Sequence, residues 1–401
     1  GEGRFPRPAT GETAMRILFR CLAAGALLAL SLQALAQNPV LRATDKVRLR
    51  LPAGVSIPNP EVAAMTRFDP ARHGYRFSNS FANNVIPEFD YRTDGLCGGM
   101  VFSVLDYFYA GMPVPDQPYR PGEGSPLRRY LYDRQVQAIT HGGNLTRWVE
   151  MSVNPFGSRN DEFFNWGFEG RLDELKRRIQ RGEPVPLAMR SCDEGCMGDH
   201  YVLAVGYDFG TWKRETDPAN RDQVKIFLYD PNHPGQTVTL KADLQRKQYY
   251  LAESTGSRWR AWFIADYARR TPPAITRPTR EVVVRMDTGN DDLRGGNDNV
   301  HIVLLGHDGR EQRYENVNYR KRWVNHSTEE VSLALPDDFH VDNLRGLRVE
   351  TTFGGGIGGD NWNLSLISAR YYGPEGERQL LFGSRGARFT GSHKRQEFPF
   401  D

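Results

Sequence analysis

Apolar side chains recur at helical spacing between residues 98 and 110, and this spacing predicts a buried helix that prolines 113 and 115 end. The apolar positions are Met100, Val101, Val104, Leu105 and Phe108. Further helical spacing covers residues 126–151, and residues 170–182 read as an amphipathic helix with a basic outer face. Short apolar runs at 184–189, 200–208 and 224–230 predict three strands, so this part of the chain is expected to be α+β.

The pattern changes after residue 270. Residues 270–278 are proline-rich and are expected to form a linker. Beyond them, predicted strands alternate with turns at 281–286, 301–305, 331–335, 346–352 and 363–372. This alternation predicts a C-terminal antiparallel β-sandwich over residues 279–401.

The amino end has the pattern of a secretory signal peptide over residues 15–36. Met15 begins a short basic segment, an apolar run follows over residues 21–32, and Ala34-Leu35-Ala36 fits a cleavage site. Residues 1–14 are then upstream or vector sequence, and residues 37–74 form an extended arm. A secreted or periplasmic protein is the expectation.

The charge composition gives no support for nucleic acid as a partner. The chain of 401 residues carries 52 basic and 49 acidic side chains, a net charge of +3 that gives no electrostatic case for nucleic acid. The 40 glycines and 25 prolines favour a chain rich in turns and strands.

The cysteines single out one thiol. Removal of the signal removes Cys21, and Cys192 and Cys196 are close enough in sequence to form a disulfide in an oxidising compartment. Cys97 is left over, between a glycine-containing loop and the predicted helix. The dipole and unpaired N–H groups of a helix start favour a thiolate, so Cys97 is a candidate nucleophile. A small buried core residue is the other role open to it.

Two further residues complete a candidate site. His200 opens one predicted strand and Asp230 ends the next, so antiparallel pairing would bring both to one edge of the sheet. A carboxylate that holds one ring nitrogen leaves the other to accept a proton from a thiol. Cys97, His200 and Asp230 therefore have the residue types of an acyl-transfer triad.

Alternatives remain open around this trio. Asn232 is a second candidate for orienting His200, and Asn79 is either a turn former or a donor to an oxyanion near Cys97. The spacing of Cys192, Cys196 and His200 fits no standard zinc pattern, so neither a metal site nor a cofactor is expected.

The same motifs resemble those of the papain-like cysteine peptidases, in particular their bacterial C39-like branch. The matching segments are Gly95-Leu-Cys-Gly-Gly-Met100 before an apolar helix, His200-Tyr-Val-Leu-Ala-Val-Gly-Tyr207, and Tyr229-Asp-Pro-Asn232. The resemblance covers residues 75–269 and implies a papain-like catalytic domain with Cys97 as nucleophile, His200 as base and Asp230 as the residue that orients it. Where the family has its oxyanion glutamine, six residues before the cysteine, this chain has Tyr91.

The C-terminal segment resembles PLAT-like β-sandwich domains. The similarity rests on residues 282–289, 299–306 and 360–366. It implies docking onto a lipid surface or a protein partner, sometimes with calcium. The acidic turn with Asp291, Asp292 and Asp298 has oxygen ligands for a hard cation, although a solvated turn is the commoner role.

These features together predict a secreted cysteine hydrolase that acts on peptide or other amide bonds of a peptide or protein substrate. A cysteine acyltransferase or amidase with the same triad, and a catalytically inert binding protein, are the alternatives.

Overall fold

The computed structural model describes residues 60–86, 91–191, 198–212, 218–254, 256–354 and 359–401. These residues all belong to one compact unit, 54–401. The predicted signal peptide and most of the predicted arm lie outside the described residues. In the described part of the chain, no helix has the length and apolar character that crossing a membrane requires.

The predicted buried helix is confirmed as α3 (Cys97–Ala110), whose residues from Cys97 to Tyr107 are all buried. The helical spacing over 126–151 corresponds to two helices, α4 (Pro126–Thr140) and α5 (Asn144–Ser152), because the chain turns at Gly142, where φ is 57°. The predicted amphipathic helix is α7 (Leu172–Gln180). Two shorter helices, α2 (Pro70–His73) and α6 (Asn160–Asn165), were not predicted.

An antiparallel sheet forms the centre of the amino-terminal region, with strand order β10-β4-β5-β6-β7-β8-β9 and β1 paired to β5. Its strands are β1 (Ala63–Met65), β4 (Val185–Arg190), β5 (His200–Asp208), β6 (Lys225–Tyr229), β7 (Thr237–Asp243), β8 (Gln248–Leu251), β9 (Arg258–Trp259) and β10 (Ala261–Ile264). A separate hairpin, β2 (Ala82–Ile86) with β3 (Tyr91–Asp94), leads into α3.

Both faces of β5 are covered. Tyr201, Leu203 and Val205 belong to the same apolar cluster as the core residues of α3, whereas Val202 and Ala204 belong to the cluster of α7. Side chains alternate between faces along a strand, so a strand buried on both sides must be apolar throughout. This explains the uninterrupted apolar run after His200. The α+β prediction for this region is confirmed at this level.

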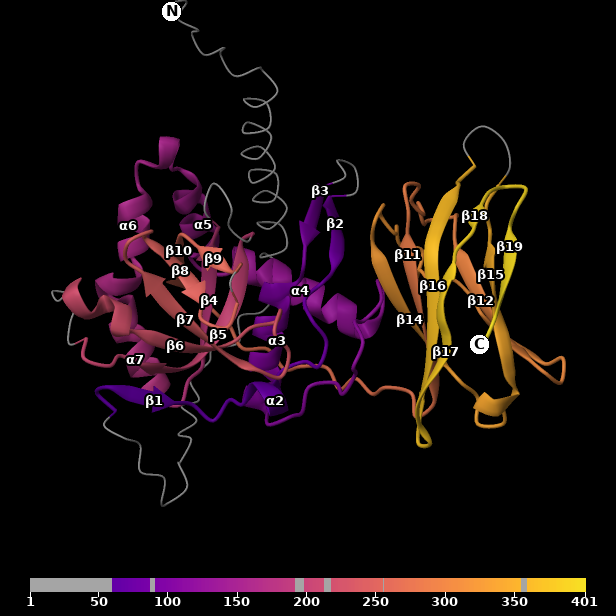
Figure 1. Cartoon of the computed structure of the whole chain (residues 1–401), viewed down its shortest axis with the longest axis horizontal. Helices are drawn as coiled ribbons and strands as arrows, with labels where there is room; N and C mark the ends of the chain where they lie inside the picture. The colour runs from indigo at the N-terminus through magenta and orange to yellow at the C-terminus, as the bar shows by residue number, and fades with distance from the viewer. Residues whose placement is uncertain (1–59, 87–90, 192–197, 213–217, 255, 355–358) are drawn as a thin grey trace, which may run out of the picture. The chain divides into compact units, whose positions relative to one another are not determined.

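The C-terminal region is a β-sandwich of two antiparallel sheets (Figure 1). One sheet has the order β14-β11-β16-β17, with β18 paired to β16, and the other has the order β13-β12-β15-β19. The strands are β11 (Glu281–Thr288), β12 (Val300–Gly306), β13 (Glu311–Tyr314), β14 (Thr328–Ala334), β15 (Leu344–Thr351), β16 (Trp362–Gly373), β17 (Gly376–Arg385), β18 (Arg388–Phe389) and β19 (Arg395–Pro399).

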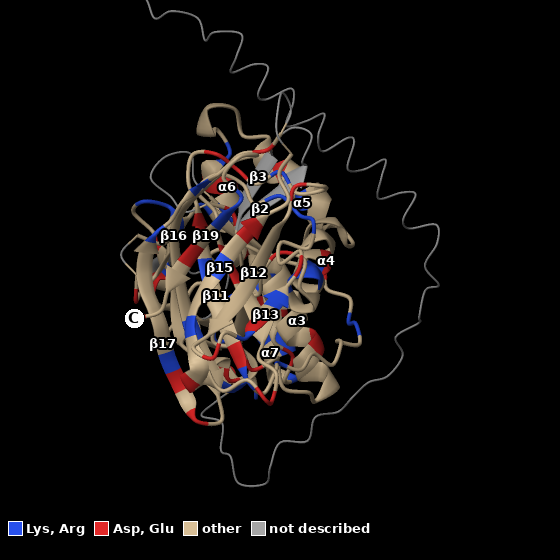
Figure 2. Cartoon of the chain, turned by 90° about the vertical axis from the view of Figure 1, so that its right-hand side faces the viewer, with Lys and Arg blue, Asp and Glu red and all other residues tan. Residues whose placement is uncertain are grey.

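One apolar core lies between the two sheets. Alternate residues of β11, namely Val282, Val284 and Met286, are completely buried in it, together with Ile302 and Leu304 of β12. The period of two is that of strands with one face on a core. Figure 2 shows basic and acidic residues interspersed over the strands, so the cartoon shows no large region of one sign.

Candidate active site

Cys97 is the first residue of α3 and is 6% exposed. It is a free cysteine, and the other three cysteines of the chain lie outside the described residues. Just before it, the Leu96 N–H donates to Asn79 Oδ1 at 2.5 Å, and Gly95 has a φ of 90° that favours glycine. This turn places the thiol at the positive end of the helix dipole, which favours an anion.

The two glycines after Cys97 allow α4 to approach α3 closely. A Cβ at Gly99 would lie 1.9 Å from the Leu131 carbonyl oxygen, and one at Gly98 would lie 2.8 Å from Ala138 Cβ. The Gly99 N–H donates to Gln135 Oε1 of α4 at 2.8 Å. A side chain at either position would push the helices apart, so the motif around Cys97 is partly a packing requirement.

His200 is the first residue of β5 and is buried. Its Nε2 lies 2.7 Å from Asp230 Oδ1, directly after the end of β6. His200 also donates a hydrogen bond to the Cys97 sulfur, and Nδ1 is the ring nitrogen left for it. The structure thus brings Cys97, His200 and Asp230 together in that order, as the antiparallel strand argument predicts.

The electrostatics of the pair favour an imidazolium beside a carboxylate. Burial alone would lower the pKa of His200, but the charge and hydrogen bond of Asp230, with a smaller contribution from Cys97, raise it above 6.5. Burial alone would raise the pKa of Asp230, but His200, a hydrogen bond from His233 and one from the Asn232 N–H hold it well below 3.8.

Asp230 has three hydrogen-bond donors. Besides His200, the backbone N–H of Asn232 donates to Oδ1 at 2.8 Å, and His233 Nδ1 lies 3.1 Å from Oδ2. Sequence reasoning missed His233, although its position three residues after Asp230 in a turn is a usable signal. The carboxylate is therefore held on both oxygens, which fixes the plane in which it meets His200.

The two candidate asparagines, Asn79 and Asn232, contact each other. Asn79 Nδ2 lies 3.3 Å from Asn232 Oδ1 while Asn79 Oδ1 accepts from Leu96. Asn232 Nδ2 lies 3.4 Å from His200 Nε2, but that nitrogen already donates its proton to Asp230 and cannot also accept one. Asp230, and not Asn232, therefore holds the imidazole through a side-chain hydrogen bond.

Trp259 covers the imidazole, and sequence reasoning missed it. Its ring stacks on His200 with 5.9 Å between centroids and 10° between planes. The indole N–H donates to the Gly198 carbonyl at 3.2 Å, and the residue is 1% exposed. A buried aromatic face beside the His200–Asp230 hydrogen bond excludes water and strengthens it.

A cleft of about 460 Å³ opens beside His200. Its lining from the α+β region is Asn79, Ser80, Phe81, Gly95, Arg120, Gly198, Asp199, His200, Asn232 and Trp259, and the β-sandwich adds His326 and Thr328. A second cavity of about 560 Å³ shares Ser80, Arg120 and Thr328 with it. Of the candidate triad, His200 lines this open groove, whose lining is partly polar and partly apolar.

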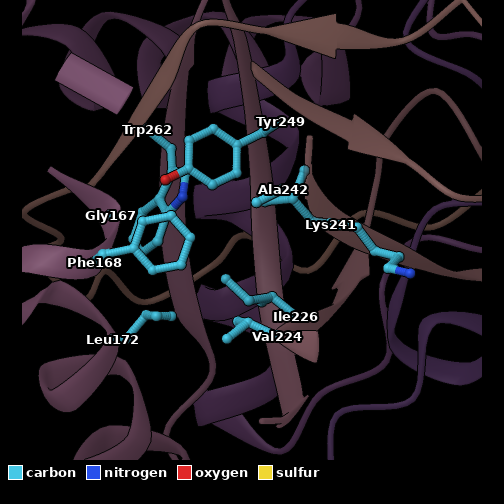
Figure 3. Close-up of a pocket in the computed structure, with 10 residues that line it drawn as sticks. Gly167, Phe168, Leu172, Val224, Ile226, Lys241, Ala242, Tyr249 and Trp262 are labelled. Carbon is cyan, nitrogen blue, oxygen red and sulfur yellow. The ribbon is translucent and has the colours of Figure 1, made fainter. Parts of the chain in front are cut away.

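A smaller cavity lies away from the triad. Figure 3 shows it among apolar side chains that include Phe168, Leu172 and Trp262. Its volume of about 10 Å³ is roughly that needed for one water molecule. It shares no lining residue with the cleft beside His200, so it has no place in the candidate chemistry.

Several sequence predictions fall on residues that the structure does not describe. Cys192 and Cys196, the predicted disulfide, lie outside the described residues, and the Tyr91 side chain does too. The backbone N–H of Cys97, in the first turn of α3, has no acceptor one helical turn earlier and is a candidate donor.

The acidic turn of the sandwich has arginine partners. Asp291 pairs with Arg388 at 2.7 Å, and Asp292 pairs with Arg322 at 2.5 Å. Among the described residues, no group of three or more histidine, cysteine, aspartate or glutamate side chains is arranged to hold a metal ion. The ion pairs favour the solvated-turn interpretation over the cation site.

No family model matches the sequence, and no curated protein matches it. The solved structures that are similar include alpha-toxin of Clostridium perfringens from avian strain SWCP, at 14% identity and a TM-score of 0.24, over 31% of this chain and 32% of that one. Alpha-toxin of Clostridium absonum has 14% identity and a TM-score of 0.21, over 28% of this chain and 31% of that one.

A lipoxygenase variant in complex with arachidonate is also similar, at 15% identity and a TM-score of 0.23, over 30% of this chain and 16% of that one. This chain thus spans about a third or less of the length of these structures. The C-terminal β-sandwich is defined by its own strand pairing and core.

Proposed function

We propose that the chain is a secreted or periplasmic cysteine hydrolase of the papain-like type, cleaving peptide or other amide bonds with Cys97, His200 and Asp230. The observation that carries the proposal is the hydrogen-bonded order Cys97, His200, Asp230 at the start of a buried helix. Buried charged pairs also occur in structural networks, but the histidine of this pair lines an open cleft and interacts with a free thiol.

The proposed reaction gives each group of the triad a defined role. The Cys97 sulfur attacks the carbonyl carbon of the amide, and the oxyanion that forms is held by backbone N–H groups at the start of α3. The C–N bond then breaks as the leaving amine takes the proton from His200. Water, deprotonated by His200, cleaves the thioester and restores the thiol, while Asp230 keeps the imidazole in one orientation.

The sandwich fits the proposal as a PLAT-like docking domain. Its two antiparallel sheets share one core and expose interspersed charges, which suits contact with a lipid surface or with a protein partner. Phe382 on β17 is 78% exposed and is one apolar side chain available for such contact.

Iodoacetamide labelling of the folded protein tests the triad. We expect His200-dependent alkylation of Cys97, read by peptide mass spectrometry, with a rate that falls about a hundredfold or more in His200→Ala. His141→Ala is the matched control, because His141 is an exposed helix cap far along the chain from the site residues. Labelling that is absent, or equal in wild type and His200→Ala, would reject the triad.

Turnover of a fluorogenic peptide library then separates the reactions. Hydrolysis predicts free carboxylate products that require Cys97. Products that appear only when an acceptor amine is added would instead indicate an acyltransferase. A folded protein with neither labelling nor turnover would indicate an inert binding protein.

A further inference from the structure

We propose that the β-sandwich forms a wall of the substrate cleft, where His326 and Thr328 bind an extended polypeptide substrate of Cys97. The inference rests on the proposed function and goes beyond it, because it assigns substrate contact to a region otherwise expected only to dock. Both residues line the cleft of about 460 Å³ that also contains His200, Asn232 and Trp259.

His326 lies in the turn before β14, and Thr328 is the first residue of β14. His326 is exposed and has a φ of 61°, a left-handed conformation that costs free energy in a residue other than glycine. Its N–H donates to the Thr288 carbonyl at 3.0 Å, which holds the turn against β11. The Thr328 hydroxyl donates to Asp287 Oδ1 at 2.7 Å, so its oxygen remains able to accept.

The wall is held in place by polar contacts with the segment between α3 and α4. Tyr119 donates its hydroxyl to Glu281 Oε2 at 2.7 Å, and the backbone N–H of Arg120 donates to Glu330 Oε2 at 2.7 Å. A Cβ at Gly122 would lie 2.6 Å from the Glu330 carbonyl oxygen, so backbone meets backbone there. Glu281 is completely buried, which means that this contact excludes water.

A second group of contacts strengthens this attachment. The Glu123 N–H donates to Glu329 Oε2 at 3.2 Å, and the rings of Tyr119 and Tyr372 pack with 5.7 Å between centroids. Tyr119, Val283 and Tyr372 form an apolar cluster of their own. Because buried polar and apolar contacts are combined, His326 and Thr328 have a defined position relative to the cleft.

The shape and lining of the cleft indicate the class of occupant. The two cavities of about 460 Å³ and about 560 Å³ adjoin each other, because Ser80, Arg120 and Thr328 line both. The serine, threonine and asparagine side chains that line them offer donors and acceptors to the amide groups of a peptide backbone. An extended polypeptide presents such groups along its whole length, whereas small molecules favour enclosed, mostly apolar pockets.

Two probes of different reach test the wall. Iodoacetamide needs only the thiol, whereas a hexapeptidyl chloromethyl ketone library must also occupy the groove. We expect the His326→Ala/Thr328→Ala variant to react with the peptidyl probe about three- to tenfold more slowly than wild type, the loss expected from one or two hydrogen bonds. Its iodoacetamide rate should stay within about twofold of wild type, because the triad is unchanged.

His307→Ala is the matched control, since His307 is an exposed histidine of the sandwich that lines neither cavity. A second readout, binding of a fluorescent hexapeptide library to Cys97→Ala with and without the two wall substitutions, does not depend on reaction at the thiol. Unchanged peptidyl-probe rates and unchanged peptide binding would show that His326 and Thr328 do not bind the substrate, and would leave the proposed triad unaffected. If iodoacetamide labelling of Cys97 does not depend on His200, the proposed function is wrong, and substrate binding by His326 and Thr328 is rejected with it.

Discussion

Asn79 and Asn232 are 153 residues apart in the sequence, yet their carboxamides meet at 3.3 Å beside the candidate triad. Asn79 comes from the segment before the hairpin that precedes Cys97, and Asn232 follows Asp230. Because the Leu96 N–H can only donate, the Asn79 atom that faces it is the oxygen, and Nδ2 faces Asn232. The pair ties the turn that positions the thiol to the turn that positions the carboxylate.

Replacing Asn79 should separate these two turns. In Asn79→Ala the Leu96 N–H loses its acceptor and Asn232 loses a donor, so the free energy of unfolding should fall by about 1–2 kcal/mol. The iodoacetamide rate of Cys97 should fall as well, since the start of α3 is less well held. Urea unfolding and labelling kinetics at pH 7 measure the two effects.

Asn79→Asp distinguishes a positioning role from an oxyanion donor. The aspartate keeps an acceptor for Leu96, so stability should stay closer to wild type than in Asn79→Ala. If Asn79 Nδ2 were instead an oxyanion donor, both variants would lose peptide turnover equally, because neither aspartate nor alanine has that N–H donor. That second pattern would contradict the positioning role.

The His200–Asp230 pair should give the protein a defined pH range of greatest stability. The pKa of His200 is raised from 6.5, so its contribution is complete below pH 6.5 and is lost as the pH rises through the raised value. The pKa of Asp230 is lowered from 3.8, so its contribution is complete above pH 3.8 and is lost as the pH falls through the lowered value. Both contributions are therefore complete between about pH 4 and 6.5.

Urea unfolding of wild type and His200→Gln from pH 3 to 10 checks this window. We expect the stability difference between them to be largest near pH 5–6 and to shrink toward alkaline pH. Asp230→Ala, which leaves a buried imidazole without its partner, should be destabilised by about 3–5 kcal/mol, and Asp230→Asn by less. A difference that grows above pH 7 would mean that His200 is neutral in the folded protein.

Local patterns were sufficient to predict the centre of the α+β region. The helix after Cys97 and the strands after His200 and before Asp230 are long apolar runs with clear ends, and antiparallel pairing of β5 with β6 brings their ends together. Among the strands that were not predicted, β17 has an exposed, mostly polar face typical of an outer strand, so its signal is weak.

The parts of the site that sequence could not supply depend on tertiary packing. Trp259 lies in the two-residue strand β9, 59 positions after His200, and only the sheet order brings the rings together. The sequence around Asn79 fits either a turn former or an oxyanion donor, and neither local sequence indicates its contact with Asn232. Such contacts follow from the register of strands that are distant in sequence.

Gly99 should tolerate no side chain. The Cβ of Gly99→Ala would lie 1.9 Å from a backbone oxygen of α4, which cannot move without displacing that helix. We expect a loss of about 1–3 kcal/mol in the free energy of unfolding, with slower labelling of Cys97. Gly354→Ala is the control, because a Cβ there meets nothing within 4 Å, and equal stability of the two variants would refute the packing requirement.

His233 should set where the protein loses stability in acid. Its Nδ1 lies 3.1 Å from Asp230 Oδ2, and this hydrogen bond, more than the opposing burial, raises the pKa of His233. Removing the donor in His233→Ala should leave the pKa of Asp230 less depressed, because one of the groups that lowers it is gone.

A less depressed pKa means that Asp230 takes up its proton at a higher pH. Stability of His233→Ala should therefore start to fall at a higher pH than that of wild type when the solution is acidified below pH 5. At pH 7 the loss should be modest, about 1 kcal/mol, because His233 is partly exposed to solvent. Urea unfolding at pH 7, 5, 4 and 3 measures both effects, with His141→Ala as the control. His233→Gln, which retains an amide donor, should fall between the two, and identical acid profiles for all variants would show that Asp230 is held without His233.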